Sequence, residues 1–308
     1  MKKWISLMLI AVLLCGCSAT AAPEAEGAFF GFTDDLDRVV EIQQPKRVAC
    51  LLGSFAQIWQ LAGGEVIATA DDVWDDLNLT LSEECVNLGN TKELSLELLL
   101  SAQPDFVLAS ANTRQNVEWM ETLEAAGIPV AYFDVADFDG YLRLLDLCTD
   151  LTGRQDLFEQ HGMQVQRQIN GILEKAEKRG TTPSVLCMRA SASMVTVKNS
   201  EDNVLGEMLK SLGCINIADS DSSLLENLSI EKILEEDPDY IFIVQRGDDT
   251  AGMKAYVEAM MQENPAWQQL TAVKAGKLYF MDKNLYNLKP NHRWGEAYEK
   301  LEEILENG

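Results

Sequence analysis

The chain is 308 residues long and has a mass of 34.2 kDa, which is enough for two domains of ordinary size. Its 49 acidic and 25 basic side chains give a formal net charge of -24 at pH 7. This charge excludes nucleic acid as a partner, because binding to phosphates requires clustered lysine and arginine, and it argues against adsorption onto anionic lipid. Two histidines are too few for a three-histidine metal centre, so no metal site is predicted.

The N-terminus has the pattern of a secretory signal peptide. Two lysines precede an apolar run over residues 4–14 that is too short to span a bilayer comfortably. The run leads into Leu-Cys-Gly-Cys, which resembles the lipobox of bacterial lipoproteins, where the cysteine after a small residue is acylated. We therefore predict that residues 1–16 are removed and that Cys17 carries the lipid. The alternative is a plain signal peptide that is cut at an alanine such as Ala19 or Ala22.

Residues 17–31 follow the signal peptide and are rich in Ala, Glu and Gly, which predicts a flexible tether. The rest of the chain holds an odd number of cysteines, so at least one is unpaired. Most of them are interpreted as small buried thiols, and no spacing among them suggests zinc. These cysteines are Cys50, Cys85, Cys148, Cys187 and Cys214.

Short apolar runs alternate with helical patterns in both halves of the chain. In residues 32–149 the predicted strands are 47–52, 66–70, 106–109 and 130–133, and the predicted helices are 55–61, 95–102 and 116–126. In residues 181–308 the predicted strands are 184–188, 240–244 and 277–281, and the predicted helices are 203–212, 229–236, 253–262 and 296–305. This alternation is typical of parallel βα units.

The two halves share a sequence pattern that indicates duplication. Residues 95–107 and 229–241 both run Ser, apolar, Glu, then Pro-Asp seven residues after the Glu, then an aromatic and a branched residue. A shared pattern of this length predicts two domains of like topology. Taken singly, Glu97 or Glu231 is explained by the favourable effect of an acid in the first turn of a helix. Their matched positions in two matched halves point to a shared role.

Residues 150–180 lack strand character and carry apolar side chains at helical spacing. A helix of roughly 25 residues is about 38 Å long, which makes a rigid connection. The expected fold is therefore α/β, with two similar parallel-sheet lobes at residues 32–149 and 181–308. One long linking helix joins them, and a ligand cleft lies between them.

The motifs together resemble the substrate-binding lipoproteins of ABC importers for iron chelates, haem and vitamin B12, the class III periplasmic binding proteins. The likeness runs from residue 46 to the C-terminus. It is carried by the first strand with Gly-Ser and a helix ending in Gly-Gly-Glu-Val-Ile-Ala, by the twin Glu…Pro-Asp units, by the single linking helix, and by residues 267–279.

The resemblance implies that Glu97 and Glu231 dock against arginines of an ABC permease dimer that works with a cytoplasmic ATPase. Paired carboxylates and guanidinium groups give oriented, charge-assisted bonding. It also implies a monomer, lipid-anchored at the outer face of the cytoplasmic membrane or in the periplasm, that captures a siderophore, haem or corrinoid. The protein would be no enzyme and would have no intrinsic cofactor.

Cleft residues are inferred from topology, because ligands of open α/β sheets bind beyond the carboxyl ends of the strands. Arginines there suit an anionic ligand, and an exposed aromatic ring could stack on a flat one. Acidic pairs such as Asp75-Asp76 and Asp248-Asp249 are interpreted as solvated surface. The predicted cleft residues are Ser54, Phe55, Trp74, Asn112, Thr113, Arg114, Arg189, Gln245, Arg246 and residues 284–293, with Tyr286 and Arg293 singled out.

Residues 286–294 resemble a family segment that often reads His-x-Lys-Pro-Asn-x-Arg-Trp. Asn287 replaces its histidine and His292 occupies a variable position, so metal ligation at this segment is not expected. Two alternatives stay open: a receptor for another solute or for a sensor, and a chelatase-like enzyme that inserts metal into a tetrapyrrole. The enzyme would need a metal-holding histidine in the cleft, for which His292 is the candidate.

Overall fold

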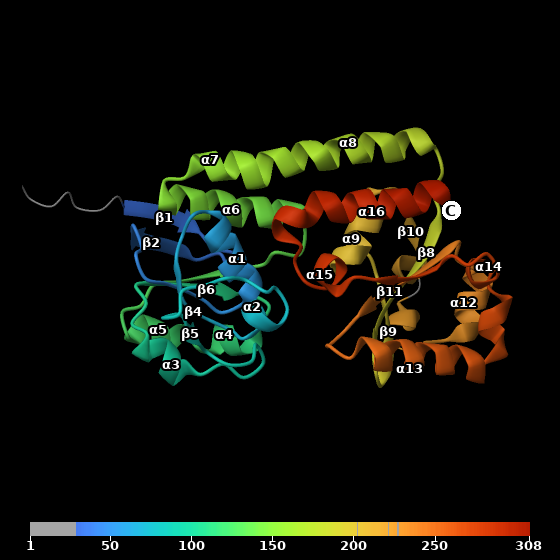
Figure 1. Cartoon of the computed structure of the whole chain (residues 1–308), viewed down its shortest axis with the longest axis horizontal. Helices are drawn as coiled ribbons and strands as arrows, with labels where there is room; N and C mark the ends of the chain where they lie inside the picture. Colours follow the sequence, from blue (N-terminus) through green and yellow to red (C-terminus); the bar gives the residue numbers. More distant parts are fainter. Residues whose placement is uncertain (1–28, 202, 221, 227) are drawn as a thin grey trace, which may run out of the picture.

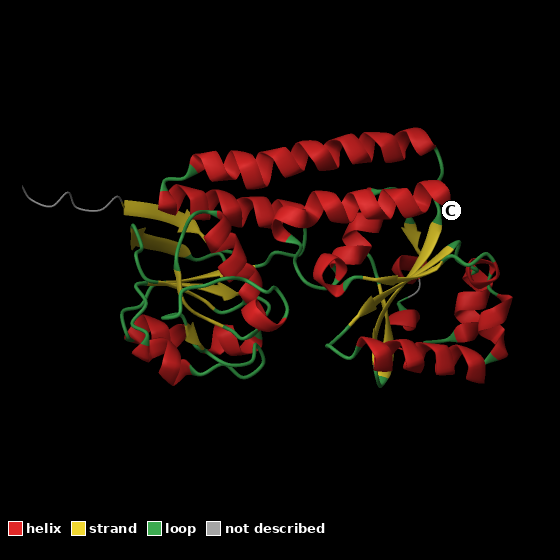
Figure 2. Cartoon of the chain, in the orientation of Figure 1, coloured by secondary structure: helices red, strands yellow, loops and turns green. Residues whose placement is uncertain are grey.

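Two β-sheets stand side by side beneath a layer of long helices (Figure 1). The computed structural model describes residues 29–308 except 202, 221 and 227, so the predicted signal peptide and Cys17 lie outside the described residues. Within the described ranges, no helix combines the length and hydropathy needed to cross a membrane. Helices and strands alternate through both lobes (Figure 2), which confirms the predicted α/β fold.

The N-terminal lobe is built on five parallel strands in the order β5-β4-β3-β6-β7. These strands are β3 (Val48–Cys50), β4 (Val66–Thr69), β5 (Val86–Asn87), β6 (Phe106–Ser110) and β7 (Val130–Phe133). The helices of the lobe are α1 (Gly53–Leu61), α2 (Asp72–Asp75), α3 (Leu96–Ser101), α4 (Arg114–Glu118), α5 (Met120–Ala125) and α6 (Phe138–Thr152). Every residue of β3, β6 and β7 is buried, as expected for parallel strands that helices cover on both faces.

The C-terminal lobe repeats this plan with strand order β10-β8-β11-β12. Its strands are β8 (Ser184–Ser191), β9 (Met194–Lys198), β10 (Ile215–Asn216), β11 (Tyr240–Gln245) and β12 (Leu278–Met281). Its helices include α9 (Val204–Ser211), α10 (Ile217–Ser220), α11 (Ser223–Glu226), α12 (Ile230–Glu236), α13 (Thr250–Glu263), α14 (Thr271–Lys274), α15 (Lys283–Tyr286) and α16 (Trp294–Asn307), with 3-10 turns at Pro265–Gln269 and Asn291–Arg293. The core of this sheet is parallel, as expected, and one added strand departs from it. Strand β9 pairs antiparallel with β8 through a two-residue turn, because the chain doubles back in a hairpin directly after β8.

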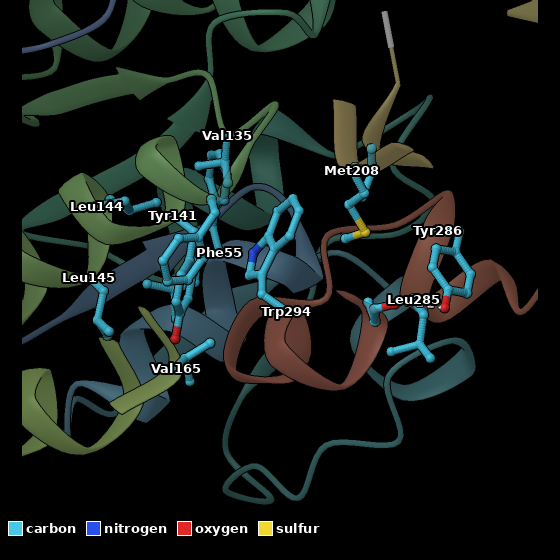
Figure 3. Packing of buried hydrophobic residues seen from close by; sticks show 14 of the residues in the cluster. Phe55, Val135, Tyr141, Leu144, Leu145, Val165, Met208, Leu285, Tyr286 and Trp294 are labelled. Atoms are coloured by element: carbon cyan, nitrogen blue, oxygen red, sulfur yellow. Dashed lines mark hydrogen bonds between the residues drawn. The ribbon is translucent and has the colours of Figure 1, made fainter. Parts of the chain in front are cut away.

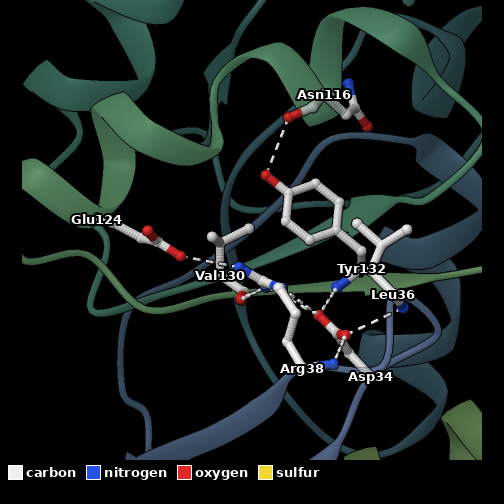
Figure 4. Close-up of polar contacts among 7 residues, drawn as sticks. All are labelled: Asp34, Leu36, Arg38, Asn116, Glu124, Val130 and Tyr132. Atoms are coloured by element: carbon white, nitrogen blue, oxygen red, sulfur yellow. Dashed lines mark hydrogen bonds and ion pairs between the residues drawn. The ribbon is translucent and has the colours of Figure 1, made fainter.

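A further hairpin precedes the N-terminal sheet. Strands β1 (Phe29–Thr33) and β2 (Val39–Gln43) pair antiparallel, so the predicted tether cannot extend to residue 31. The Arg38 guanidinium donates to the Asp34 carboxylate at 2.8 Å and to the Val130 carbonyl oxygen at 2.6 Å (Figure 4). The Asp34 carboxylate also accepts the Tyr132 N–H. These bonds fix the hairpin to β7.

The linking helix runs from α7 (Gln155–Phe158) through a π-turn (Glu159–Met163) into α8 (Gln164–Arg179). The predicted boundary at residue 150 is too early, because residues 150–152 close α6 and Gly153 ends that helix in the left-handed conformation, with φ 69°. Helices α6 and α16 lie beneath the linking helix, one over each lobe (Figure 1). Both lobes therefore pack beneath a helical layer that is two helices thick.

One buried apolar cluster continues from the N-terminal lobe into the C-terminal lobe beneath this layer. Trp294, at the start of α16, is fully buried, and its ring meets Phe138, at the start of α6, with centroids 6.0 Å apart. Figure 3 shows Phe55 and Tyr141 on one side of Trp294, and Met208 and Tyr286 on the other. Because a large aromatic side chain fills the junction, the two lobes are packed together as well as covalently joined.

Candidate functional site

A cavity of 630 Å³ lies between the lobes, at the carboxyl ends of β11 and β12. The N-terminal lobe contributes Asp75, Asp76 and Asn78 to its lining. The C-terminal lobe contributes Gln245, Asp248, Thr250, Met253, Lys254, Phe280, Met281, Asp282, Lys283 and Asn284. Its volume falls in the range of small-molecule sites, and its walls combine a few apolar side chains with many polar ones.

Lys283 connects the two walls of this cavity. Its ammonium group donates to the Asp76 carboxylate at 2.6 Å and also to the Asp248 carboxylate. Burial acts to lower the pKa of Lys283, but hydrogen bonds to Asp248 and Asp76 outweigh it, and the pKa is raised overall. The hydrogen bond from Lys283 lowers the pKa of Asp248. Lys283 is therefore charged at neutral pH and is shared between a carboxylate of each lobe.

Arg189 and Arg246 lie side by side on the C-terminal lobe. Arg189 is near the end of β8, and Arg246 follows β11, where its N–H donates to the Ala190 carbonyl oxygen at 2.7 Å. Burial, together with the charge of Arg246, lowers the pKa of Arg189. All ten arginines of the chain are described, and only these two have guanidinium groups that donate no hydrogen bond within the described residues. The Nε atom of Arg189 is buried without a partner.

Several predicted cleft residues lie elsewhere. Phe55 and Tyr286 are core residues, at 0% and 2% exposure, and Tyr286 donates its hydroxyl to the Ala297 carbonyl oxygen. They point inward because each belongs to a short helix that packs one face on the core. Neither ring can stack on a ligand in this structure, so these two predictions are wrong.

The other residues predicted for the cleft have partners nearby in the sequence, are exposed, or pack against the core. Arg293 makes a two-pronged ion pair with Glu296, at 2.7 and 3.0 Å. Arg114 is exposed and pairs with Glu118 in the same helix. Asn112 is exposed and Thr113 half-buried in the loop before α4. Ser54 is buried, and Trp74 packs partly against the core. Among the predicted residues singled out by name, only Gln245 lines the cavity.

The sequence analysis missed the charged residues of the cavity. Asp76 and Asp248 belong to the acidic pairs interpreted as solvated surface, and Lys283 stands one position before the predicted segment 284–293. Their signal was available, because Asp248 lies in the loop after β11 and Asp76 ends the short helix α2 that follows β4. Acidic character alone does not distinguish a solvated surface segment from one that lines a site beyond a strand end.

Residues 287–293 cross from the C-terminal lobe to α1 of the N-terminal lobe. The Asn291 side-chain amide donates to the Ser54 carbonyl oxygen at 3.0 Å and to Gln57 at 2.7 Å. The Lys289 ammonium lies 5.9 Å from the centre of the Phe55 ring. Burial lowers the pKa of Lys289, although nearby Asp134 and Asp72 oppose this. These contacts hold residues 287–293 against α1, so this segment is a second point at which the lobes are joined.

The two histidines meet outside the cavity. His161 lies in the π-turn of the linking helix and His292 in the 3-10 turn before α16, with ring centroids 6.2 Å apart. Burial lowers the pKa of both imidazoles. No cluster of three or more His, Cys, Asp or Glu with metal-binding geometry occurs among the described residues. His292 is therefore not placed to hold a metal against a ligand in the cavity.

Glu97 and Glu231 occupy equivalent, exposed positions in the first turns of α3 and α12. In each helix the preceding serine, Ser95 or Ser229, caps the N-terminus by accepting a backbone N–H. The two caps have nearly identical backbone angles, φ -91° and ψ 108° in one and φ -90° and ψ 109° in the other. The duplicated sequence pattern thus corresponds to a duplicated local structure.

Comparison with known proteins places the chain in a family. The periplasmic binding protein family matches residues 48–285. The Fe(3+)-citrate-binding protein YfmC of Bacillus subtilis is 26% identical over 303 residues, covering 92% of this chain and 91% of that protein. The haem complex of Staphylococcus aureus IsdE superposes with a TM-score of 0.68 at 16% identity, covering 84% of this chain and 98% of IsdE. S. aureus SirA complexed with staphyloferrin B superposes with a TM-score of 0.67 at 18% identity, covering 90% of this chain and 98% of SirA. The family match spans most of the sequence, and this chain belongs to the periplasmic binding protein family.

Proposed function

We propose that this protein is an extracytoplasmic receptor that binds an anionic iron or cobalt chelate between its lobes and delivers it to an ABC permease. It captures and releases its ligand without making or breaking covalent bonds. The names of similar proteins support this class of ligand, because they include a ferric citrate binder and a staphyloferrin B complex. The observation that carries the proposal is the adjacent, unpartnered pair Arg189 and Arg246.

Two guanidinium groups without partners are a costly arrangement. Each repels the other, and the partly buried Arg189 has also lost hydration. On a chain of net charge -24, carboxylates that could neutralise them are abundant, yet the described part of the chain offers them none. An anion that bridges both groups would relieve the repulsion and accept two-pronged, charge-assisted hydrogen bonds. Arg246 directly follows Gln245, which lines the cavity, so such an anion would lie beside it.

Calorimetric titration with ferric citrate, haemin, cobalamin and a ferric hydroxamate of zero net charge tests this proposal. We expect one of the anionic chelates to bind, and Arg189→Gln or Arg246→Gln to weaken it at least tenfold, about 1.4 kcal/mol. The matched control is Arg143→Gln, which removes an exposed arginine that contacts Asp35. Equal affinity of the wild type and both variants for every bound chelate would contradict the assignment of the arginines.

Delivery to a permease would use Glu97 and Glu231, and Cys17 would hold the protein at the membrane surface by its lipid. A Glu97→Ala/Glu231→Ala variant is expected to lose uptake of the chelate in cells while it keeps its affinity in solution. The control is Glu121→Ala/Glu258→Ala, a pair of exposed acids, one on each lobe. Normal uptake by the first variant would rule out this docking role and favour a receptor that serves a sensor.

A further inference from the structure

Two neighbouring side chains of α15, Lys283 and Asn284, join the walls of the cavity. Asp76 follows α2 in the N-terminal lobe, whereas Lys283 begins α15 and Asp248 follows β11 in the C-terminal lobe. Lys283 donates to both carboxylates, and the Asn284 side-chain amide donates to the Asp76 backbone oxygen at 3.2 Å. In Figure 1, α2 and α15 face each other across the space between the lobes.

The two bonds of Lys283 differ in their surroundings. The side chains of Lys283 and Asp76 are 17% and 20% exposed, so water and salt screen their attraction only in part. The Asp248 side chain is 84% exposed, so its bond is well screened. Asp248 belongs to the same lobe as Lys283 and holds the ammonium group in position. The bond to Asp76 is the one that joins the lobes.

We propose that Lys283 is a latch that holds the two lobes closed over the cavity. Without its ammonium group, the Asp76 and Asp248 carboxylates, which belong to different lobes and both contact Lys283, would face each other without a compensating cation, and their like charges would favour separation of the two walls. The helical layer and the Trp294 junction limit how far the lobes can part, so the latch acts on a small opening. A solute would enter or leave only while the Asp76 bond is broken.

Hydrogen exchange of the ligand-free, full-length chain, followed by mass spectrometry, tests the latch directly. In Lys283→Met and in Asp76→Asn we expect amides of residues 71–79 and of 282–288 to exchange about tenfold faster, equivalent to about 1.4 kcal/mol. Asp248→Asn should have a smaller effect, since it leaves the bond between the lobes in place. Lys283→Arg should restore slow exchange, and the Asp76→Asn/Lys283→Met pair should be no faster than either single variant.

Exchange within β6 serves as the internal control, because its protection reports on the core of the N-terminal lobe and should not change. Exchange rates at residues 71–79 and 282–288 that equal those of the wild type in Lys283→Met would overturn the latch. The latch would also be overturned if the effects of the two single variants on exchange added up in the double variant, since additivity assigns the two residues independent structural roles.

A second test of the latch measures the rate at which ferric citrate is released, by stopped-flow capture with an iron chelator. A working latch predicts faster release from Lys283→Met, and unchanged release would contradict control of exit by Lys283. If ferric citrate does not bind the wild type at all, ferric citrate is excluded as the ligand. The latch is then still decided by the exchange rates of the ligand-free chain.

Discussion

Asp105 and Asp239 hold equivalent positions in the two lobes. Each carboxylate accepts backbone N–H groups at the entry to its lobe's first parallel strand, Lys46 and Arg47 at 2.9 and 2.8 Å in one lobe and Ser184 at 2.8 Å in the other. The backbone N–H of each aspartate donates in return to the carbonyl oxygen of Arg47 or Ser184, at 2.9 Å in both cases. The duplicated Pro-Asp turn therefore sets the alignment of two neighbouring strands in each sheet.

Replacing either aspartate should weaken its lobe by a similar amount. Asp105→Ala loses two charge-assisted hydrogen bonds at an exposed site, for which we expect about 1–2 kcal/mol of unfolding free energy. Asp239→Ala should cost about the same. Urea denaturation of both variants measures this. If one variant lost unfolding free energy and the other did not, the two turns would not share a role.

The ion pair between Arg179 and Glu302 should matter far more than an exposed pair on the same two helices. Their side chains are 10% and 3% exposed, and Arg179 also donates to the Leu212 carbonyl oxygen. Arg179→Met leaves the Glu302 carboxylate buried without compensation, so we expect a loss of about 3–5 kcal/mol in urea denaturation.

The control for that variant is Lys175→Met, which removes a pair with Glu306 whose side chains are 52% and 47% exposed. It should cost less than about 1 kcal/mol. An equal cost for the two variants would mean that burial of the ion pair is not what makes it important.

Glycine at position 53 is required by close packing. A Cβ atom there would lie 2.8 Å from both the Asp72 carboxylate oxygen and the Val73 backbone nitrogen. Gly53→Ala is therefore expected to destabilise the protein by about 1–3 kcal/mol. Gly171→Ala, at an open position in α8, should instead stabilise it by about 0.5–1 kcal/mol. Thermal unfolding of the two variants should shift in opposite directions.

Stability should fall as pH rises through the titration of Asp72. Burial, together with the charges of Asp76 and Asp71, raises the pKa of Asp72 to about 6, although its bond from the Gly53 N–H opposes this. An acid with a higher pKa in the folded state keeps its proton more tightly there, so folding is favoured at low pH. This contribution, about 3 kcal/mol, is lost as pH rises from about 4 to 6.

Asp72→Asn removes the titrating group and should abolish that part of the pH dependence. The measurement is urea denaturation of wild type and variant at steps between pH 4 and pH 7. If both curves keep the same slope across this range, Asp72 is not its source.

The sequence predicts the lobes and their duplication well, because buried parallel strands read as continuous apolar runs. It predicts the cavity poorly. Asp76 and Lys283 are 207 residues apart, and no periodicity shows that two loops will meet. Phe55 follows a strand as a cleft residue should, but helix α1 already begins at Gly53 and turns its ring into the core. Position at a strand end therefore indicates the region of a site without fixing which way each side chain points.

The π-turn at Glu159–Met163 has a geometric consequence for the whole molecule. Successive residues of an α-helix are rotated by about 100° around its axis. An extra residue accommodated in the linking helix therefore changes the rotational phase of α8 relative to α7, and with it the direction in which the C-terminal lobe faces. Deletion of Gly162 would convert the turn to regular helix and rotate the C-terminal wall of the cavity relative to the N-terminal wall.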